Sequence, residues 1–309
     1  MELRQLRTFE MVATHGSFTA VARELNVSQP AVSAQIQALE SELGVRLLER
    51  LPRQVLLTPM GEALLGYARR LLNLEAEARR TLAELRGAQD AYLRIGASPT
   101  IGAYVLPEIV REFKRGHPHV RIVAEIESTY RIAEALQTHA IDVGLVEAVV
   151  EADTVAAHAF RTDELVLIVP PTHPWAQRQS IQPLELAEQP VIAREPASGS
   201  RALVEEALRA LGVSVPPALE LGGIEAIKNA VALGLGVSFV SRHAIQAEHK
   251  LGSLVAVPVE GLDLRRFFYC LHDRQRYISP VLQSFLDLVQ GMGGDVRRQT
   301  ESIEDRPQV

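Results

Sequence analysis

The chain has 309 residues, of which 47% are hydrophobic, and its formal net charge at pH 7 is −6. This length is enough for two or three domains with cores of their own. No segment approaches the roughly 18 uninterrupted apolar residues of a membrane helix, and the first residues begin an amphipathic helix instead of a secretory signal. We therefore expect a cytoplasmic protein with no membrane partner. The single cysteine, Cys270, excludes an intrachain disulfide.

The first clear pattern is a short amphipathic helix near the N-terminus. Phe18, Val21, Ala22 and Leu25 fall at i, i+3, i+4 and i+7, which predicts one apolar face, and Ser17 is placed to cap the helix. The two residues after this face break the helix. A second helix is therefore expected to follow almost at once.

The second helix has the layout of a recognition helix. Ser28 can cap it, and Pro30 is tolerated because a first-turn residue has no intrahelical amide bond to lose. The expected buried stripe is Val32, Ile36, Leu39 and Leu43, so the residues expected to face outward are Pro30, Ala34, Gln37 and Ser41, flanked by Gln29 and Ser33. In a helix-turn-helix, the early residues of such a helix touch base edges. A helical hairpin that serves only for packing is the alternative, which apolar periodicity alone does not exclude.

Particular residue types suit contacts to a DNA duplex. Gln29 can offer a donor and an acceptor to adenine, Ser33 can bond to a base or a phosphate, and Ala34 can contact a thymine methyl. The run L-L-E-R-L-P-R-Q-V-L-L-T predicts two short strands around a Pro52-Arg53 turn, which would hold Arg53 at the tip of a wing in a narrow minor groove. Phosphate contacts that position the protein complete the candidate DNA-binding set, which is Thr19, Arg23, Gln29, Pro30, Ser33, Ala34, Gln37, Arg50, Arg53 and Thr58. Basic and acidic residues balance up to Met60, so the footprint must come from how charges are sorted over the surface.

Three N-terminal motifs together resemble the DNA-binding domain of LysR-type transcriptional regulators. They are L-R-Q-L-R-T-F-E-M-V-A, then G-S-F-T-A-V-A-R-E-L-N-V-S-Q-P-A-V-S-A-Q-I-Q-A-L-E-S-E-L-G-V-R-L-L-E-R, and L-T-P-M-G-E. The resemblance implies binding to double-stranded promoter DNA at an interrupted palindrome with a T and an A at the half-site ends. Many relatives carry Arg where this chain has Ala34, which leaves the flanking base preference open.

Residues 59–87 predict one long helix without an internal proline. Its apolar positions alternate in spacings of four and three, the repeat of a two-helix seam: Leu64, Ala68, Leu71, the misfit Glu75, Ala78, Leu82 and Leu85. At about 1.5 Å per residue the helix would reach roughly 40 Å, long enough to space two DNA-reading heads. A helix packed on its own domain is the alternative. The resemblance favours a linker that joins a dimer, with a dimer of dimers as the expected assembly.

The rest of the chain alternates short apolar strands with helices, which predicts α/β sheets with covered faces. The expected strands are residues 92–97, 121–127, 141–146, 165–170, 191–193, 237–240 and 266–271. The overall expectation is an α+β multi-domain protein: a winged helix-turn-helix (1–58), a linker and dimerisation helix (59–89), an effector-binding domain (90–292) and a disordered tail (293–309). The family resemblance gives the effector domain a two-lobed, periplasmic-binding-protein-like fold, with lobe 1 at about 90–160 and 266–292 and lobe 2 at about 161–265. Ligands in such folds lie at strand C-termini in the cleft.

Helix starts point to the residues that line this cleft. Ser98 and Thr100 follow the first strand and precede a helix, so hydroxyls and free amides converge there. In the other lobe, R-E-P-A-S-G-S-R places a second helix start in the same role, and the residues involved are Ser198, Gly199, Ser200 and Arg201. Thr129, just past the second strand, is a further candidate. Opposed helix N-termini and a guanidinium favour a small anionic effector, whereas ordinary helix capping is the alternative for each residue. The stretch also resembles R-E-P-x-S-G-T-R in LysR-type regulators linked to carbon fixation and sulfur-compound metabolism.

The sequence shows no catalytic, cofactor or metal-binding pattern. No H-E-x-x-H, G-x-S-x-G or G-x-x-x-x-G-K-S/T string occurs, and no Cys or carboxylate follows His117 and His119 at ligand spacing. We therefore expect a ligand-responsive transcription factor that is not an enzyme. The alternative is a two-lobed small-molecule-binding module or enzyme tethered to DNA by its N-terminal domain.

Overall fold

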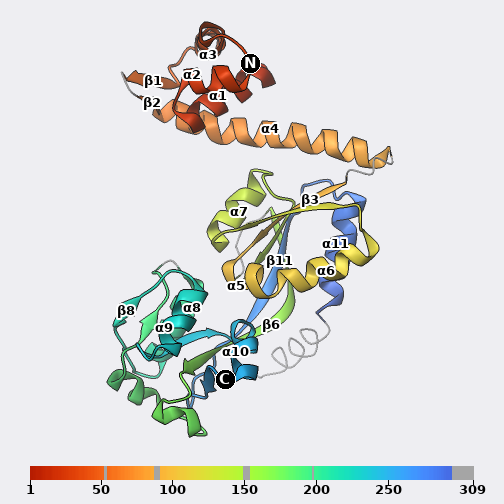
Figure 1. The fold of residues 1–309 in the computed structure, drawn as a ribbon. Helices are drawn as coiled ribbons and strands as arrows, with labels where there is room; N and C mark the ends of the chain where they lie inside the picture. The colour runs from red at the N-terminus through yellow and green to blue at the C-terminus, as the bar shows by residue number, and fades with distance from the viewer. Residues whose placement is uncertain (52–53, 87–90, 149–153, 197, 294–309) are drawn as a thin grey trace, which may run out of the picture. The chain divides into compact units, whose positions relative to one another are not determined.

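The computed structural model describes residues 1–51, 54–86, 91–148, 154–196 and 198–293 (Figure 1). The chain divides into two compact units, one of Met1–Ala91 with Glu134–Ile141 and one of Tyr92–Ala133 with Asp142–Val309. None of the described helices is long and apolar enough to cross a membrane. The predicted Pro52-Arg53 turn and residues 294–309 of the predicted tail lie outside the described residues.

The N-terminal unit begins with three helices and a hairpin. The helices are α1 (Leu3–His15), α2 (Phe18–Glu24) and α3 (Gln29–Leu43), and the hairpin pairs β1 (Leu48–Leu51) with β2 (Gln54–Leu57) in antiparallel register. This is the predicted order of a helix-turn-helix followed by a two-stranded wing.

Local hydrogen bonds set the boundaries of α2 and α3. The Ser17 hydroxyl accepts from the amide of Ala20 at 3.3 Å, and the Ser28 hydroxyl accepts from the amide of Ala31 at 3.4 Å, so both predicted N-caps are confirmed. Asn26, between the helices, has φ 54°, a left-handed conformation that Asn adopts more readily than most residues. The tight turn between the two helices therefore follows from the sequence.

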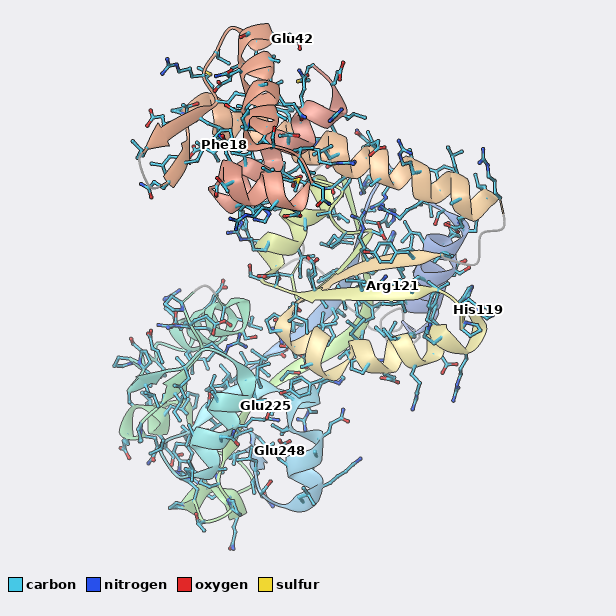
Figure 2. The ribbon with its side chains drawn as sticks, turned by 45° about the horizontal axis from the view of Figure 1, so that its top comes forward. Phe18, Glu42, His119, Arg121, Glu225 and Glu248 are labelled. Atoms are coloured by element: carbon cyan, nitrogen blue, oxygen red, sulfur yellow. The ribbon has the colours of Figure 1, made fainter. Side chains whose placement is uncertain are left out.

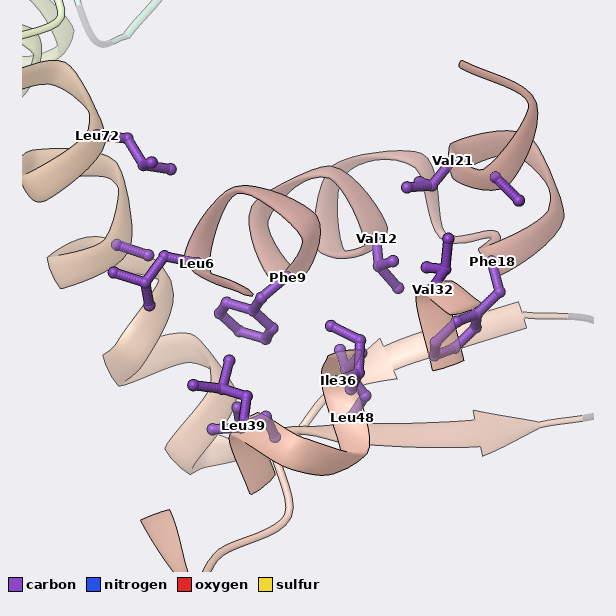
Figure 3. Close-up of a cluster of buried hydrophobic side chains, with 13 residues drawn as sticks. Leu6, Phe9, Val12, Phe18, Val21, Val32, Ile36, Leu39, Leu48 and Leu72 are labelled. Atoms are coloured by element: carbon purple, nitrogen blue, oxygen red, sulfur yellow. The ribbon is translucent and has the colours of Figure 1, made fainter. Parts of the chain in front are cut away.

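The core of this unit forms where α1, α2 and α3 meet (Figure 3). Phe9, Val12, Val21, Val32 and Ile36 are each 0% exposed. Burying a side chain of this kind is worth about 1.5–3 kcal/mol relative to leaving it in water. The stripe along α3 is thereby held inward, and the opposite face of α3 is turned outward.

One predicted member of the α3 stripe is wrong. Leu43 is 38% exposed, whereas Leu39, one turn earlier, is fully buried. Leu43 is the last residue of α3, and Gly44 turns the chain with φ 69°. The helix therefore ends at the edge of the core, which the i, i+4 spacing alone does not reveal.

The long predicted helix is α4 (Pro59–Leu85), capped by the Thr58 hydroxyl, which accepts from the amide of Gly61 at 3.0 Å. Its first turns pack in the N-terminal core through Ala68 and Leu72. Three side chains of the predicted seam are exposed: Leu71, Leu82 and Leu85 are 40%, 57% and 58% exposed. The first half of the helix therefore packs on its own domain, and the dimer seam stays a prediction.

The second unit is built on a seven-stranded mixed sheet in the order β10-β6-β11-β5-β3-β4, with β9 also paired to β6. Its strands are β3 (Tyr92–Ala97), β4 (Arg121–Ile126), β5 (Val143–Val146), β6 (Val155–Val169), β9 (Ser238–Ser241), β10 (Val255–Val257) and β11 (Arg265–Asp273), and β7 (Ile192–Ala193) pairs separately with β8 (Leu219–Glu220). Its helices are α5 (Pro99–Tyr104), α6 (Leu106–Gly116), α8 (Gly199–Ala210), α9 (Ile224–Ala232), α10 (Gln246–Leu251) and α11 (Pro280–Gly291). The helix α7 (Thr129–Gln137) begins in this unit, and its last residues belong to the segment Glu134–Ile141 of the first unit.

Two long strands join the two groups of elements in this unit. β6 and β11 pair antiparallel from Val155↔Asp273 to Glu164↔Arg265. One end of β11 pairs with β5, while the far half of β6 pairs with β9 and β10. We call the part built on β3, β4 and β5 lobe 1, and the part that carries α8, α9 and α10 lobe 2. The predicted strand 165–170 thus covers only the last third of a fifteen-residue strand, whose earlier part passes between the lobes.

Gly61 offers a test of the packing between α4 and the N-terminal core. A Cβ at this position would lie 2.1 Å from the carbonyl oxygen of Leu47, whereas a Cβ at Gly66 on the same helix would meet nothing within 4 Å. We predict that Gly61→Ala lowers the free energy of unfolding by about 1–3 kcal/mol through overpacking. Gly66→Ala should instead raise it by up to about 1 kcal/mol, because Ala is the better helix former.

Scanning calorimetry of the full-length variants measures both effects. The order of melting temperatures should be Gly66→Ala, wild type, Gly61→Ala. Equal melting temperatures for Gly61→Ala and wild type would contradict the close contact between α4 and Leu47.

Candidate DNA-reading surface and effector cleft

The outward face of α3 carries the predicted base-reading residues. Gln29, Pro30, Ala34 and Gln37 are exposed, and Ser33 is half-buried at the margin of the stripe. On α2, the predicted phosphate contacts Thr19 and Arg23 are exposed. A polar, solvent-facing helix surface above a buried stripe is the geometry that enters a major groove.

The remaining predicted DNA contacts lie at the wing and at the start of α4. The Thr58 hydroxyl donates to the carbonyl of Arg46 at 2.7 Å while it caps α4, so its hydrogen-bonding capacity is largely used inside the protein. Arg53 lies outside the described residues, and for Arg50 the structure describes the backbone of β1.

In the second unit, the predicted hydroxyls lie at helix starts but do not cap them. Ser98, Thr100, Ser198 and Ser200 are each less than a tenth exposed. Neither Ser98 nor Ser198, at the N-cap positions of α5 and α8, makes a side-chain cap hydrogen bond. Ser98 instead donates to the carboxylate of Glu147 at 3.2 Å. The capping alternative is therefore not what these two serine side chains do.

Arg266, on β11, brings the two lobes together at this place. Its Nη1 donates to Glu147 in lobe 1 at 3.0 Å and to the Ser200 hydroxyl in lobe 2 at 2.9 Å. Its Nε donates to Asp163 on β6 at 2.8 Å. Asp163 is 0% exposed at its side chain and also accepts from the Ser241 hydroxyl at 2.6 Å. The residues Ser98, Glu147, Asp163, Ser200 and Arg266 form one polar cluster where the lobes meet, at the place expected for the cleft, and we call it the cleft cluster.

The guanidinium bonded to this cluster belongs to Arg266, whereas the predicted Arg201 bonds to other partners and stays a prediction as an effector contact. Arg201 donates to Glu205 at 2.7 Å, to Glu220 at 2.8 Å and to the carbonyl of Arg194 at 2.9 Å, all within lobe 2. Hydrogen bonds to the two carboxylates raise the pKa of Arg201 above its ordinary value. Sequence reasoning missed Arg266, although an arginine pair before the apolar run F-F-Y-C-L at a lobe crossing was a usable signal.

The other two predicted cleft residues are placed less centrally. Gly199 is exposed at the first position of α8, and Thr129 is half-buried at the first position of α7. Among the described residues, no hydrogen bond joins the Thr129 hydroxyl to the cleft cluster. Their contacts to an effector stay a prediction.

A second contact between the lobes lies at the end of α5. The Tyr104 hydroxyl donates to Glu225 on α9 at 2.5 Å, and Lys228 lies 5.2 Å from the centre of its ring. Lys228 also donates to Glu248 on α10 at 2.6 Å. Figure 2 labels the two carboxylates, Glu225 and Glu248. Burial and the bond to Glu225 raise the pKa of Tyr104 to about 12. The phenol therefore stays protonated and keeps its donor role at physiological pH.

The described residues hold no group of three or more His, Cys, Asp or Glu side chains that could bind a metal ion. The lone thiol is buried: Cys270 on β11 is 1% exposed, and burial raises its pKa to about 12. Since the thiolate is the nucleophile of cysteine chemistry, this thiol is inert in the folded chain.

Comparison with known proteins gives the family. Residues 3–62 match the family described as bacterial regulatory helix-turn-helix protein, lysR family, and residues 86–293 match the LysR substrate binding domain. The chain belongs to the LysR family of transcriptional regulators.

Three known proteins are similar to this chain over most of their own length. The chain is 35% identical to the RuBisCO operon transcriptional regulator of Allochromatium vinosum, over 94% of this chain and 95% of the relative. Full-length CbnR complexed with its target DNA superposes with a TM-score of 0.73 at 25% identity, over 94% of this chain and 100% of the other. The regulatory domain of CcmR from Synechocystis PCC6803, in complex with 2-PG, gives a TM-score of 0.62 at 27% identity, over 67% and 99%. The chain is therefore similar to carbon-fixation regulators.

The buried thiol provides a test of the packing of β11. We predict that iodoacetamide at pH 8 leaves Cys270 of the folded protein unmodified, because the raised pKa suppresses the thiolate and burial excludes the reagent. In concentrated guanidinium chloride the same thiol should be labelled fully, as mass spectrometry would show. Rapid labelling of the folded chain would contradict the burial of β11.

Proposed function

We propose that this protein is a ligand-responsive transcriptional regulator that reads promoter DNA with the outward face of α3 and acts in the cytoplasm. The single observation that carries the proposal is the burial of Val32, Ile36 and Leu39, which leaves Gln29 and its neighbours facing solvent. The CbnR complex with target DNA supports the same use of this head. Membership of the LysR family and relatives named as regulators make the chain a regulator and not an enzyme tethered to DNA.

The contacts divide into two kinds. Gln29, Pro30, Ser33, Ala34 and Gln37 read base edges, of which Gln29 has the groups for a bidentate contact to adenine. The contacts to the phosphate backbone come from the remaining candidates, which are Thr19, Arg23, Arg50 and Thr58, and Arg53 enters the minor groove.

Substitution of Gln29 tests base reading. We predict that Gln29→Ala lowers discrimination between the operator and a one-base variant of it by about 1–3 kcal/mol, since a bidentate contact is lost. Arg23→Ala should weaken binding to all sequences and reduce the slope of log affinity against log salt by about one. Gel shifts or fluorescence anisotropy at several salt concentrations measure both quantities.

The control is Gln246→Ala, the same exchange at an exposed position on α10. It should leave both the discrimination and the salt slope at wild-type values. Unchanged discrimination in Gln29→Ala would remove α3 from the base-reading role.

We further propose that α4, with the boundaries 59–89 for the linker, joins two chains into a dimer and that two dimers form the working assembly. The exposed side chains of Leu71, Leu82 and Leu85 support this proposal. Their spacing is that of a two-helix interface, and they are solvent-exposed in a single chain. Sedimentation as a monomer at working concentration would refute the dimer.

We propose a small anionic effector for the cleft, held by Ser98, Thr100, Ser200 and Arg266, with Thr129, Ser198 and Gly199 at its edges and Arg201 supporting α8. The cluster of hydroxyls around one buried guanidinium supports an anion. The similarity to RuBisCO regulators and to a regulatory domain in complex with 2-PG makes 2-phosphoglycolate the first probe to use. Its binding must differ between assembly states if it is to change promoter contacts.

Calorimetry with 2-phosphoglycolate tests this site. We predict binding to the wild type and a loss of about threefold to tenfold in affinity for Ser200→Ala, which removes one hydroxyl from the cleft cluster. Ser180→Ala is the matched control, because it removes a hydroxyl that bonds to Glu260 on lobe 2 outside the cluster. Equal losses in the two variants would place the anion elsewhere.

A further inference from the structure

The carboxylate of Glu147 is bonded to two of the groups that we assign to the effector site. Its two oxygens accept from the Ser98 hydroxyl and from Arg266 Nη1, so it takes up one hydroxyl and the guanidinium of the cleft cluster at the same time. We propose, on the basis of the proposed effector site, that Glu147 is an internal competitor: its carboxylate occupies Arg266 until an anionic effector displaces it. Glu147 thereby sets which anions the cleft accepts.

The burial and the hydrogen bonds of Arg266 support an exchange in which an effector replaces Glu147 as its partner. Its side chain is only 9% exposed, and its Nη2 is buried and makes no hydrogen bond among the described residues. Nη2 lies 2.8 Å from Asp163 Oδ2, so the two groups form an ion pair, but the geometry is not that of a hydrogen bond. A buried N–H group without a hydrogen bond costs free energy, and a correctly placed acceptor recovers that free energy. An effector oxygen that reaches Nη2 supplies that acceptor.

The charges and the exposure of the two carboxylates in the cleft cluster indicate which one an entering anion displaces. One guanidinium faces two carboxylates, so the cluster carries a surplus negative charge before any ligand enters. Asp163 is 0% exposed and held by Ser241 as well as by Arg266, whereas the Glu147 side chain is 12% exposed and lies nearer to solvent. An entering anion therefore displaces Glu147 and leaves Asp163 in place.

This arrangement predicts a dependence on ligand charge. A displaced Glu147 carboxylate stays close to the bound anion, and repulsion between like charges grows in proportion to the charge on the ligand. Removing the charge of Glu147 should therefore help a dianion more than a monoanion. A purely structural role for Glu147 would give no such ordering.

The experiment compares full-length wild type with Glu147→Gln, which keeps the size and an acceptor for Ser98 but removes the charge. Calorimetry with 2-phosphoglycolate, inorganic phosphate and glycolate measures the affinities. We expect Glu147→Gln to bind 2-phosphoglycolate and phosphate about tenfold more tightly than the wild type, and glycolate with a smaller gain. Glu112→Gln is the control, because it removes the same charge from an exposed pair with Arg115 in lobe 1. It should change none of the three affinities.

Each outcome decides the proposal. Tighter binding by Glu147→Gln supports it, even if the wild type binds too weakly to measure. Equal or weaker binding by a Glu147→Gln protein that melts at the wild-type temperature overturns it, and a gain equal for all three anions overturns the dependence on ligand charge. Failure of both proteins to bind any of the anions also overturns it, whereas binding of operator DNA in the same preparations would show that the proposed regulator function stands separately.

Discussion

The ion pair between Arg266 and Asp163 is the interaction on which the effector cleft depends. It joins the two strands, β11 and β6, that run between the lobes, and both side chains are largely shielded from water. Removing one partner of such a pair leaves an uncompensated buried charge, at a cost of about 3–5 kcal/mol. The guanidinium is thus fixed at the crossing, where it can reach Glu147 in lobe 1 and Ser200 in lobe 2. In the proposed site, ligand binding and the contact between the lobes therefore depend on the same residue.

A second buried pattern performs the corresponding task in the N-terminal unit. The stripe of Val32, Ile36 and Leu39 holds α3 against the other two helices, and this burial turns Gln29 outward. No charge excess is needed for this, because the orientation comes from apolar packing. In a helix-turn-helix protein, contacts to phosphates position the head on the duplex, and we propose that the residues of α3 select the sequence.

Much of the fold followed from sequence spacing, and the errors have physical causes. The caps Ser17 and Ser28 and most of the α3 stripe depend on neighbours within one or two turns, so local patterns were sufficient. Leu43 was misplaced because the edge of a core is set by other elements.

At the lobe crossing, sequence reasoning named Ser98 and Ser200, which bond to the cleft cluster, but not Arg266, the arginine that joins them. Ser98 and Ser200 were recognisable from helix starts, whereas the partners of Arg201 and Arg266 come from residues distant along the chain. Arg201 donates to Glu220 within lobe 2. Arg266 donates to Glu147 of lobe 1, which lies 119 residues away in the sequence. Only the folded sheet shows that Arg266, and not Arg201, bonds to both lobes.

A crystal structure of the full-length protein with bound 2-phosphoglycolate tests the central claim most directly. The account predicts density for an anionic group between the hydroxyls of Ser98 and Ser200, within hydrogen-bond distance of Arg266 Nη2, with the Glu147 side chain turned away. An anion bound at another place, with the pair between Glu147 and Arg266 intact, would contradict it.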